Sequence, residues 1–272
     1  MFVLDEEKLS RLAAEFRDAY ARAAPFPHVV IDDFLPEEVL RSTVQSFPRP
    51  KEIDWHEFDN PRQKKLAVNR ETRIEAGARL LLYQLNSATF MEFLEGLTGI
   101  EGLIPDPYFT GGGLHQIERG GYLKIHADFN RHPKLNLDRR LNLLLYLNEN
   151  WTEEYGGHLE LWDKEMTRCD RRILPTFNRC VIFNTTDVSF HGHPEPLACP
   201  EGVTRKSLAL YYYSNGRPDA ESSQSHGTLV QPRPGEIIDG LNGRTAAGSV
   251  KSVLKRFIPP VVADAYARLR RK

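Results

Sequence analysis

The spacing of apolar residues predicts helices in the first hundred residues of the chain. After Asp5, which is suited to cap a helix, apolar residues recur at helical intervals, at Leu9, Leu12, Ala13, Phe16 and Tyr20. A β-branched apolar run over residues 28–34 predicts a strand. A second helix is predicted from Pro36, where the missing N–H of proline costs nothing. The richly apolar stretch 80–97 predicts a third helix, which packs outside a sheet.

After Pro107 the pattern changes to short apolar or alternating runs that are separated by turn-forming residues. Strands are predicted near residues 113–118, 122–128, 141–147, 158–162, 179–184 and 205–214. This texture is typical of a β-sandwich or barrel. We therefore expect a mainly β fold with flanking helices, built as a double-layered antiparallel barrel.

Two stretches lack any clear period. Residues 48–73 are rich in proline and charge, and residues 218–248 are polar and rich in glycine and proline, so both are predicted as loops. Each is a candidate to cover the mouth of the barrel, although a plain surface connection fits as well. The basic tail from Lys251 is predicted to form a helix that docks on its own domain.

Length and composition favour a single domain over residues 1–272, since a barrel of this size is routinely one unit. We divide it into helical support with a first strand (1–105), a barrel core with the functional site (106–215), and a loop with a C-terminal helix (216–272).

Charge and cysteine content narrow the cellular context. A formal net charge of −1 gives no global field that would attract nucleic acid or an anionic membrane. The three cysteines form no C-x-x-C motif, which fits a reducing cytoplasm better than a disulfide framework. The N-terminus lacks a signal-peptide pattern, and the longest apolar runs are too short to span a bilayer. The expectation is a soluble cytoplasmic protein.

The chemistry centres on His126 and Asp128, which stand two positions apart on a predicted strand and so share one face. An imidazole and a carboxylate side by side are two thirds of the 2-His-1-carboxylate set that binds Fe(II) and leaves positions open. The third ligand should come from a later strand, and His191 is the best candidate. Alone, the H-x-D pattern is weak, because such pairs are more often structural.

A second group of residues points to a carboxylate-binding site. On the last strong strand, alternation places Arg205, Ser207, Ala209 and Tyr211 on one face. A guanidinium is planar and always charged, so it can hold a carboxylate through two parallel hydrogen bonds.

Taken in order, these motifs resemble the Fe(II)- and 2-oxoglutarate-dependent dioxygenases, and most closely their prolyl 4-hydroxylase-like branch. The similarity covers about residues 110–215 and includes Gly156-Gly157-His158, Ser189-Phe190-His191-Gly192 and Arg205-Lys206-Ser207. The resemblance implies a double-stranded β-helix, also called a jelly-roll or cupin-like barrel.

The resemblance also implies a set of site residues and cofactors. Fe(II) would be held by His126, Asp128 and His191, with His193 as the less favoured alternative to His191. Arg205 and Ser207 would grip the distal carboxylate of 2-oxoglutarate, and Tyr122 and Arg140 would lie near that pocket. The implied co-substrates are 2-oxoglutarate and O2, with ascorbate as a candidate reductant.

The implied reaction hydroxylates an unactivated C–H bond of a protein prolyl residue or a small metabolite, with release of succinate and CO2. The main alternative is a non-catalytic, cupin-like metal-binding or sensor barrel, which would have no need of an inward arginine such as Arg205. A nucleic-acid demethylase is disfavoured, because Tyr211 stands where that branch tends to carry a second arginine. A zinc hydrolase is disfavoured because H-E-x-x-H is absent from the sequence. The oligomeric state is not indicated by the sequence.

Overall fold

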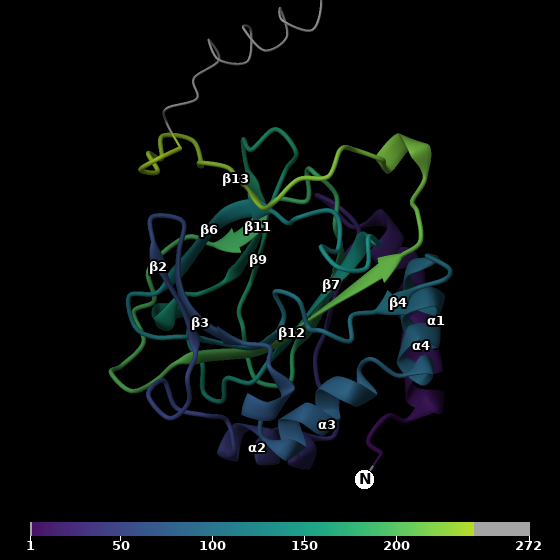
Figure 1. The fold of residues 1–272 in the computed structure, drawn as a ribbon, viewed down its shortest axis with the longest axis horizontal. Helices are drawn as coiled ribbons and strands as arrows, with labels where there is room; N and C mark the ends of the chain where they lie inside the picture. Colours follow the sequence, from purple (N-terminus) through teal and green to yellow (C-terminus); the bar gives the residue numbers. More distant parts are fainter. Residues whose placement is uncertain (1, 242–272) are drawn as a thin grey trace, which may run out of the picture. The chain divides into compact units, whose positions relative to one another are not determined.

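The computed structural model describes residues 2–241, in which antiparallel strands form one curled sheet with helices on its outside (Figure 1). By its internal contacts the chain divides into a unit of residues 1–234 and a second unit of residues 235–272. The predicted C-terminal helix falls outside the described residues, and the assignment of the whole chain to one domain stays a prediction.

Four α-helices precede most of the sheet: α1 (Glu6–Arg22), α2 (Glu37–Gln45), α3 (Ala76–Gln84) and α4 (Ala88–Thr98). As expected, the Asp5 side chain caps α1 by accepting a hydrogen bond from the Lys8 amide. The single helix predicted over residues 80–97 is wrong, because the chain turns there and α4 starts anew with Ser87 as its N-cap. Short 3₁₀ turns also occur at Glu71–Arg73, Glu153–Tyr155 and Asp219–Glu221.

Thirteen strands lie within residues 2–241, and every strand pair is antiparallel. The main path of the sheet runs β1-β10-β7-β12-β5-β3-β6-β11-β8-β9. The strands are β1 (His28–Ile31), β2 (His56–Asn60), β3 (Gln63–Val68), β4 (Ile104–Pro105), β5 (Gly113–Ile117), β6 (Tyr122–Ala127), β7 (Asp138–Tyr146), β8 (Leu159–Trp162), β9 (Cys169–Ile173), β10 (Cys180–Asn184), β11 (His191–His193), β12 (Arg205–Ser214) and β13 (Leu229–Val230). The predicted mainly β fold with flanking helices is confirmed.

The stretch 48–73 is not the loop that its irregular sequence predicts. It contains the hairpin of β2 and β3, and β3 pairs with β5 through Leu66–Val68 and with β6 through Gln63 and Lys64. This strand is therefore the seam between the two halves of the curled sheet. The pattern was hidden because β3 turns polar side chains, those of Gln63 and Lys65, toward the interior cavity.

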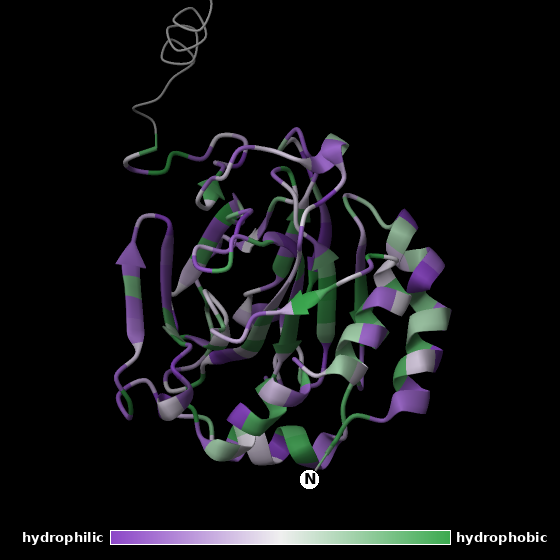
Figure 2. Ribbon diagram, turned by 45° about the vertical axis from the view of Figure 1, so that its right-hand side comes forward, coloured by the Kyte–Doolittle hydropathy of each residue, from purple (hydrophilic) through white to green (hydrophobic). Residues whose placement is uncertain are grey.

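The main apolar core lies between the helices and the outer face of β7 and β12 (Figure 2). Leu141, Leu143 and Leu145 alternate along β7 toward the helices, and Leu208 and Leu210 do the same on β12. Because these leucines are almost fully buried, burial of each contributes about 1.5–3 kcal/mol to stability. The opposite face of the same two strands is left to line a cavity.

The chain after β12 returns to the cavity. The loop predicted over residues 218–248 is only partly correct, because this segment contains the short strand β13. Arg217 donates hydrogen bonds to the carbonyls of Arg139 (2.7 Å) and Thr185 (2.9 Å). Further along, β13 pairs with β6, so that Val230 lies opposite His126. This segment is thus anchored to the sheet beside the predicted metal ligands.

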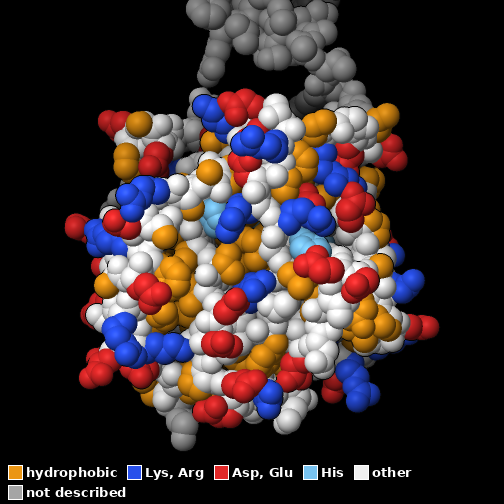
Figure 3. Space-filling model, turned by 180° about the vertical axis from the view of Figure 1, so that it is seen from behind, with side chains coloured by type: hydrophobic (Ala, Val, Ile, Leu, Met, Phe, Trp, Pro, Cys, Tyr) orange, Lys and Arg blue, Asp and Glu red, His pale blue; other side chains and the backbone are white. Residues whose placement is uncertain are grey.

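The protein surface shows no sign of a single dominant charge on the face drawn in Figure 3, where acidic and basic side chains are mixed. This mixture agrees with the formal net charge of −1. Among the helices of residues 2–241, none is both long and apolar enough to cross a membrane.

Candidate metal centre and cavity

The structure brings His126, Asp128 and His191 together at one end of a cavity of about 510 Å³. One potential ligand atom from each of the three side chains lies within 4.8 Å of the others. His126 and His191 are register partners on the antiparallel pair β6 and β11, and Asp128 follows β6 directly. Two strands therefore supply the whole set, as alternation on the predicted strand suggested for the first two residues.

Backbone hydrogen bonds fix both imidazole rings in the same tautomer. Nδ1 of His126 lies 2.8 Å from the Lys124 carbonyl oxygen, and Nδ1 of His191 lies 2.9 Å from the Ser189 carbonyl oxygen. A carbonyl only accepts, so Nδ1 must hold the proton and Nε2 keeps its lone pair. Both Nε2 atoms face Asp128, at 3.6 Å from Oδ1 and 3.4 Å from Oδ2 respectively.

Asp128 is held in place by two residues of β7. Its Oδ2 accepts hydrogen bonds from Nδ2 of Asn142 (2.7 Å) and Nη2 of Arg139 (3.0 Å). Asn142 in turn accepts from Nε and Nη2 of Arg139 (3.1 and 2.7 Å). Burial alone would raise the pKa of Asp128, but the Arg139 guanidinium holds it well below its usual range. The carboxylate is therefore ionised and oriented.

This donor set fits Fe(II). Two imidazole Nε2 atoms and one ionised carboxylate converge at one site, and the cavity leaves space on the open side. Burial and the neighbouring His126 lower the pKa of His191 to about 4, so its ring is neutral at physiological pH and able to bind a cation. Hydrogen-bonded ligands of this kind are the usual arrangement around a metal.

The arginine of β7 that lines the cavity is Arg139, whereas the resemblance implied that Arg140 would lie near the pocket. A β-bulge causes the difference: Tyr212 and Tyr213 of β12 pair with Leu141 and Arg139, which leaves Arg140 as the extra residue. Arg140 instead donates to Ser214 Oγ (3.2 Å) and lies 3.6 Å from the Glu221 carboxylate. Arg139 therefore lines the cavity, and Arg140, which the resemblance placed near the pocket, is not among the lining residues.

Arg205 lines the cavity with its guanidinium buried. Its Nε donates to the Gly157 carbonyl (2.8 Å) and its Nη2 to the Tyr146 hydroxyl (3.2 Å). The contact needs glycine at position 157, because a Cβ there would meet Leu197 at 2.6 Å and Arg205 itself at 3.0 Å. Ser207 lines the same cavity two residues along β12, as alternation predicted.

Tyr122 does not line the cavity. Its hydroxyl donates to the Asn60 carbonyl (3.1 Å) at the tip of the β2–β3 hairpin, and Lys124 lies over its ring. The site position inferred for Tyr122 from the resemblance is not where the structure places it.

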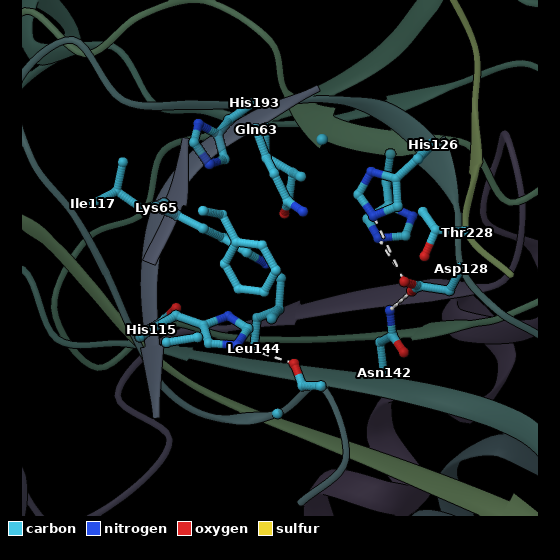
Figure 4. A pocket seen from close by; sticks show the side chains of 18 of the residues that line it. Gln63, Lys65, His115, Ile117, His126, Asp128, Asn142, Leu144, His193 and Thr228 are labelled. Atoms are coloured by element: carbon cyan, nitrogen blue, oxygen red, sulfur yellow. Dashed lines mark hydrogen bonds and ion pairs between the residues drawn. The ribbon is translucent and has the colours of Figure 1, made fainter. Parts of the chain in front are cut away.

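Several cavity-lining residues were not assigned a role from the sequence, among them Lys65, His115 and Tyr211. Lys65 and His115 lie across the cavity from Asp128 and Asn142, on the same side as His193 (Figure 4). Tyr211 packs against the Arg139 guanidinium, whose Cζ is 3.5 Å from the ring centroid. Lys65 could not be singled out from the sequence, because it lies in a proline-rich stretch without a hydrophobic pattern.

Gly192, between His191 and His193, allows β11 to lie unusually close to β6. A Cβ at Gly192 would lie 2.8 Å from the Leu123 carbonyl oxygen and 2.9 Å from that of Lys124. Only glycine allows β11 to approach β6 so closely, and the register shifts by one residue at this point. His191 joins the metal-ligand group and the His193 ring lies elsewhere in the cavity, as the preference for His191 anticipated.

Comparison with known proteins agrees with this geometry. The family model of the 2OG-Fe(II) oxygenase superfamily matches residues 112–213, a span that holds the His126, Asp128, His191 and Arg205 positions. Residues 112–213 belong to the 2OG-Fe(II) oxygenase superfamily. The recognition of this superfamily and of its prolyl 4-hydroxylase-like branch from sequence motifs is confirmed.

Two relatives extend the comparison beyond the oxygenase span. The chain is 26% identical over 199 residues to mouse prolyl 3-hydroxylase OGFOD1, which covers 70% of this chain and 33% of the relative. Over 213 residues it is 26% identical to the Xenopus laevis protein of the same name, covering 73% of this chain and 37% of that protein. The chain thus spans about a third of the length of these curated relatives.

A solved structure shares the fold. A prolyl hydroxylase from Trichoplax adhaerens, in complex with a peptide fragment of the hypoxia inducible factor oxygen degradation domain, superposes with a TM-score of 0.54. The two sequences are 19% identical, and the match covers 80% of this chain and 96% of that chain. The oxygenase span therefore has the predicted double-stranded β-helix architecture.

Proposed function

We propose that the chain is an Fe(II)- and 2-oxoglutarate-dependent dioxygenase that hydroxylates a prolyl residue of a protein or peptide. One observation carries the proposal: a 2-His-1-carboxylate group and a buried arginine line the same cavity. A barrel that only bound a metal would need the first but not the second. Four basic side chains but only one carboxylate are found among the described cavity-lining residues, which favours an anionic ligand.

The roles follow from the donors available. His126, Asp128 and His191 would hold Fe(II), and Asn142 and Arg139 would keep the Asp128 carboxylate turned toward it. When bound, Fe(II) supplies the oxidising chemistry: 2-oxoglutarate and O2 give succinate and CO2, and one oxygen atom enters the substrate C–H bond. The protein contributes orientation and exclusion of water.

Arg205 and Ser207 would bind the distal carboxylate of 2-oxoglutarate. With Nε and Nη2 already engaged by Gly157 and Tyr146, the guanidinium plane is fixed, so little side-chain entropy remains to be lost on binding. The site is buried, which strengthens each charge-assisted hydrogen bond compared with water.

The prolyl substrate is supported by the relatives rather than by the cavity. Both curated relatives are named prolyl 3-hydroxylases, although this chain spans about a third of their length. We therefore propose a protein or peptide partner and give a small metabolite the second place. A cytoplasmic location, consistent with three free cysteines, and ascorbate as the reductant belong to the same proposal.

The test is succinate release from 2-oxoglutarate by the purified protein with Fe(II), screened over proline-containing peptides with mass spectrometry of the products. A gain of one oxygen atom on proline is expected. His126→Ala and Asp128→Ala should each abolish turnover, while Arg205→Met should mainly raise the KM for 2-oxoglutarate. Turnover on free amino acids or sugars but on no peptide would refute the prolyl assignment, and an unchanged KM in Arg205→Met would refute the clamp.

A further inference from the structure

The cavity contains a lysine whose ammonium group is left without a partner. Three alternate residues of β3 line the cavity, namely Gln63, Lys65 and Ala67, and Lys65 is the central one. Among residues 2–241 its Nζ makes neither a hydrogen bond nor an ion pair, and it contacts only the face of the Phe58 ring, 5.3 Å from the ring centroid. Burial lowers its pKa to about 8, which shows how poorly its charge is compensated. A half-buried cation that lines a cavity without a counter-ion is suited to bind an anion.

His193 presents a second unsatisfied group on the same side of the cavity. It is 3% exposed, and neither Nδ1 nor Nε2 has a hydrogen-bond partner within the described part of the chain. Buried polar atoms in native proteins are almost always paired, so an orphaned ring in a cavity wall marks a place for a ligand. Figure 4 shows His193, Lys65 and His115 together, opposite His126 and Asp128.

These groups surround the same space as Arg205 and Ser207. All four residues line the cavity, and Nη1 of Arg205 and Oγ of Ser207 have no hydrogen-bond partner among the described residues. An ionised carboxylate offers about four lone-pair positions to donors. Arginine, serine, lysine and a neutral imidazole can supply four donors, one from each residue.

We propose that Lys65 and His193 bind the distal carboxylate of 2-oxoglutarate together with Arg205 and Ser207, and that Lys65 makes the site selective for a dicarboxylate. The inference rests on the proposed function and deepens it. It assigns to the β2–β3 hairpin, which lies outside the matched span 112–213, a direct part in co-substrate binding.

The test compares two ligands that differ only in the distal group. 2-Oxoglutarate and 2-oxopentanoate share the 2-keto acid head, but 2-oxopentanoate ends in a methyl group. Isothermal titration of each into the full chain loaded with Mn(II), which supports no turnover, gives two dissociation constants without any assay of activity. Lys65→Met should weaken 2-oxoglutarate binding about 10- to 100-fold and leave 2-oxopentanoate binding unchanged, because one charge-assisted hydrogen bond is lost.

Lys64→Met is the matched control. Lys64 is the neighbour of Lys65 on β3, its side chain is 50% exposed, and it lies 3.6 Å from the Asp59 carboxylate rather than in the cavity. This variant should bind both ligands like the wild type. His193→Leu should likewise reduce affinity for 2-oxoglutarate more than for 2-oxopentanoate, while Mn(II) affinity stays unchanged.

The outcomes separate the inference from the function beneath it. If Lys65→Met kept the wild-type preference for 2-oxoglutarate, or lost affinity for both ligands equally, the role of Lys65 would be overturned and the dioxygenase proposal would stand. If the wild-type protein with Mn(II) failed to bind 2-oxoglutarate, the proposed function would fall and the inference with it.

Discussion

Asn142 provides a direct test of whether Asp128 is oriented to bind a metal. The side chain is 2% exposed, donates to Asp128 Oδ2 over 2.7 Å and accepts two hydrogen bonds from Arg139. Asn142→Leu keeps a similar size but removes all three bonds. Asp128 then retains only the 3.0 Å hydrogen bond from Arg139, so its carboxylate is held less firmly in the orientation that faces the two histidines.

Two magnitudes follow from this loss. Mutation of a residue that positions a metal ligand typically costs 10- to 100-fold in metal affinity, about 1.4–2.7 kcal/mol. The metal-free protein should also lose about 1–3 kcal/mol of stability, because Arg139 donors are left buried without an acceptor. Mn(II) affinity by isothermal titration and thermal unfolding in chelator measure the two effects separately.

Asn184→Leu is the matched control for this experiment. Asn184 ends β10, next to β7, and accepts a hydrogen bond from the Tyr20 hydroxyl on the side of the sheet away from the cavity. That variant should lose stability but bind Mn(II) like the wild type. Wild-type Mn(II) affinity in Asn142→Leu would refute the reasoning, since Asp128 would then bind without its support or would not be a ligand.

Further predictions concern the backbone and the buried histidines. Gly192→Ala should cost about 1–3 kcal/mol of stability and weaken Mn(II) binding, because its Cβ would lie 2.8 Å from the Leu123 carbonyl oxygen. Gly227→Ala is the control, because a Cβ there meets nothing within 4 Å. Thermal unfolding and isothermal titration should show no change in that variant. Burial lowers the pKa of His115 to about 3 and that of His191 to about 4, so between these values and 6.5 the unfolded state binds more protons than the folded state. Stability of the metal-free protein is therefore fully present above pH 6.5 and falls by a few kcal/mol as the pH drops toward 4, a slope that chemical denaturation at several pH values should show and that His115→Asn should reduce. An equal slope in that variant would contradict the burial argument.

Much of the site could be predicted because period-two alternation is rigid on a regular strand. His126 with Asp128 and Arg205 with Ser207 come from strands whose pattern the sequence displays, and all four side chains line one cavity. His191 was the best candidate for the third ligand from its place on a later strand, and the resemblance supplied the preference for His191 over His193.

The misses arise where the backbone departs from that regularity. A bulge at Arg140 exchanges the faces of neighbouring arginines, and nothing local in the residues around it marks the irregularity. Lys65 was missed because a strand with a polar inner face, as in β3, shows no hydrophobic alternation. Tyr122 was transferred from the resemblance alone, and its own hydrogen bond to Asn60 turns it elsewhere.

The position of β3 has a consequence for how small an active fragment can be. Because this strand joins β5 to β6, a protein trimmed to residues 112–213 would leave β5 and β6 each with a bare edge, whose unpaired amides and carbonyls are open to pairing with other chains. Such a fragment should aggregate, although it contains every predicted iron ligand. The span that matches the family is therefore shorter than the segment that forms the sheet, and only the longer segment keeps β3 paired between β5 and β6.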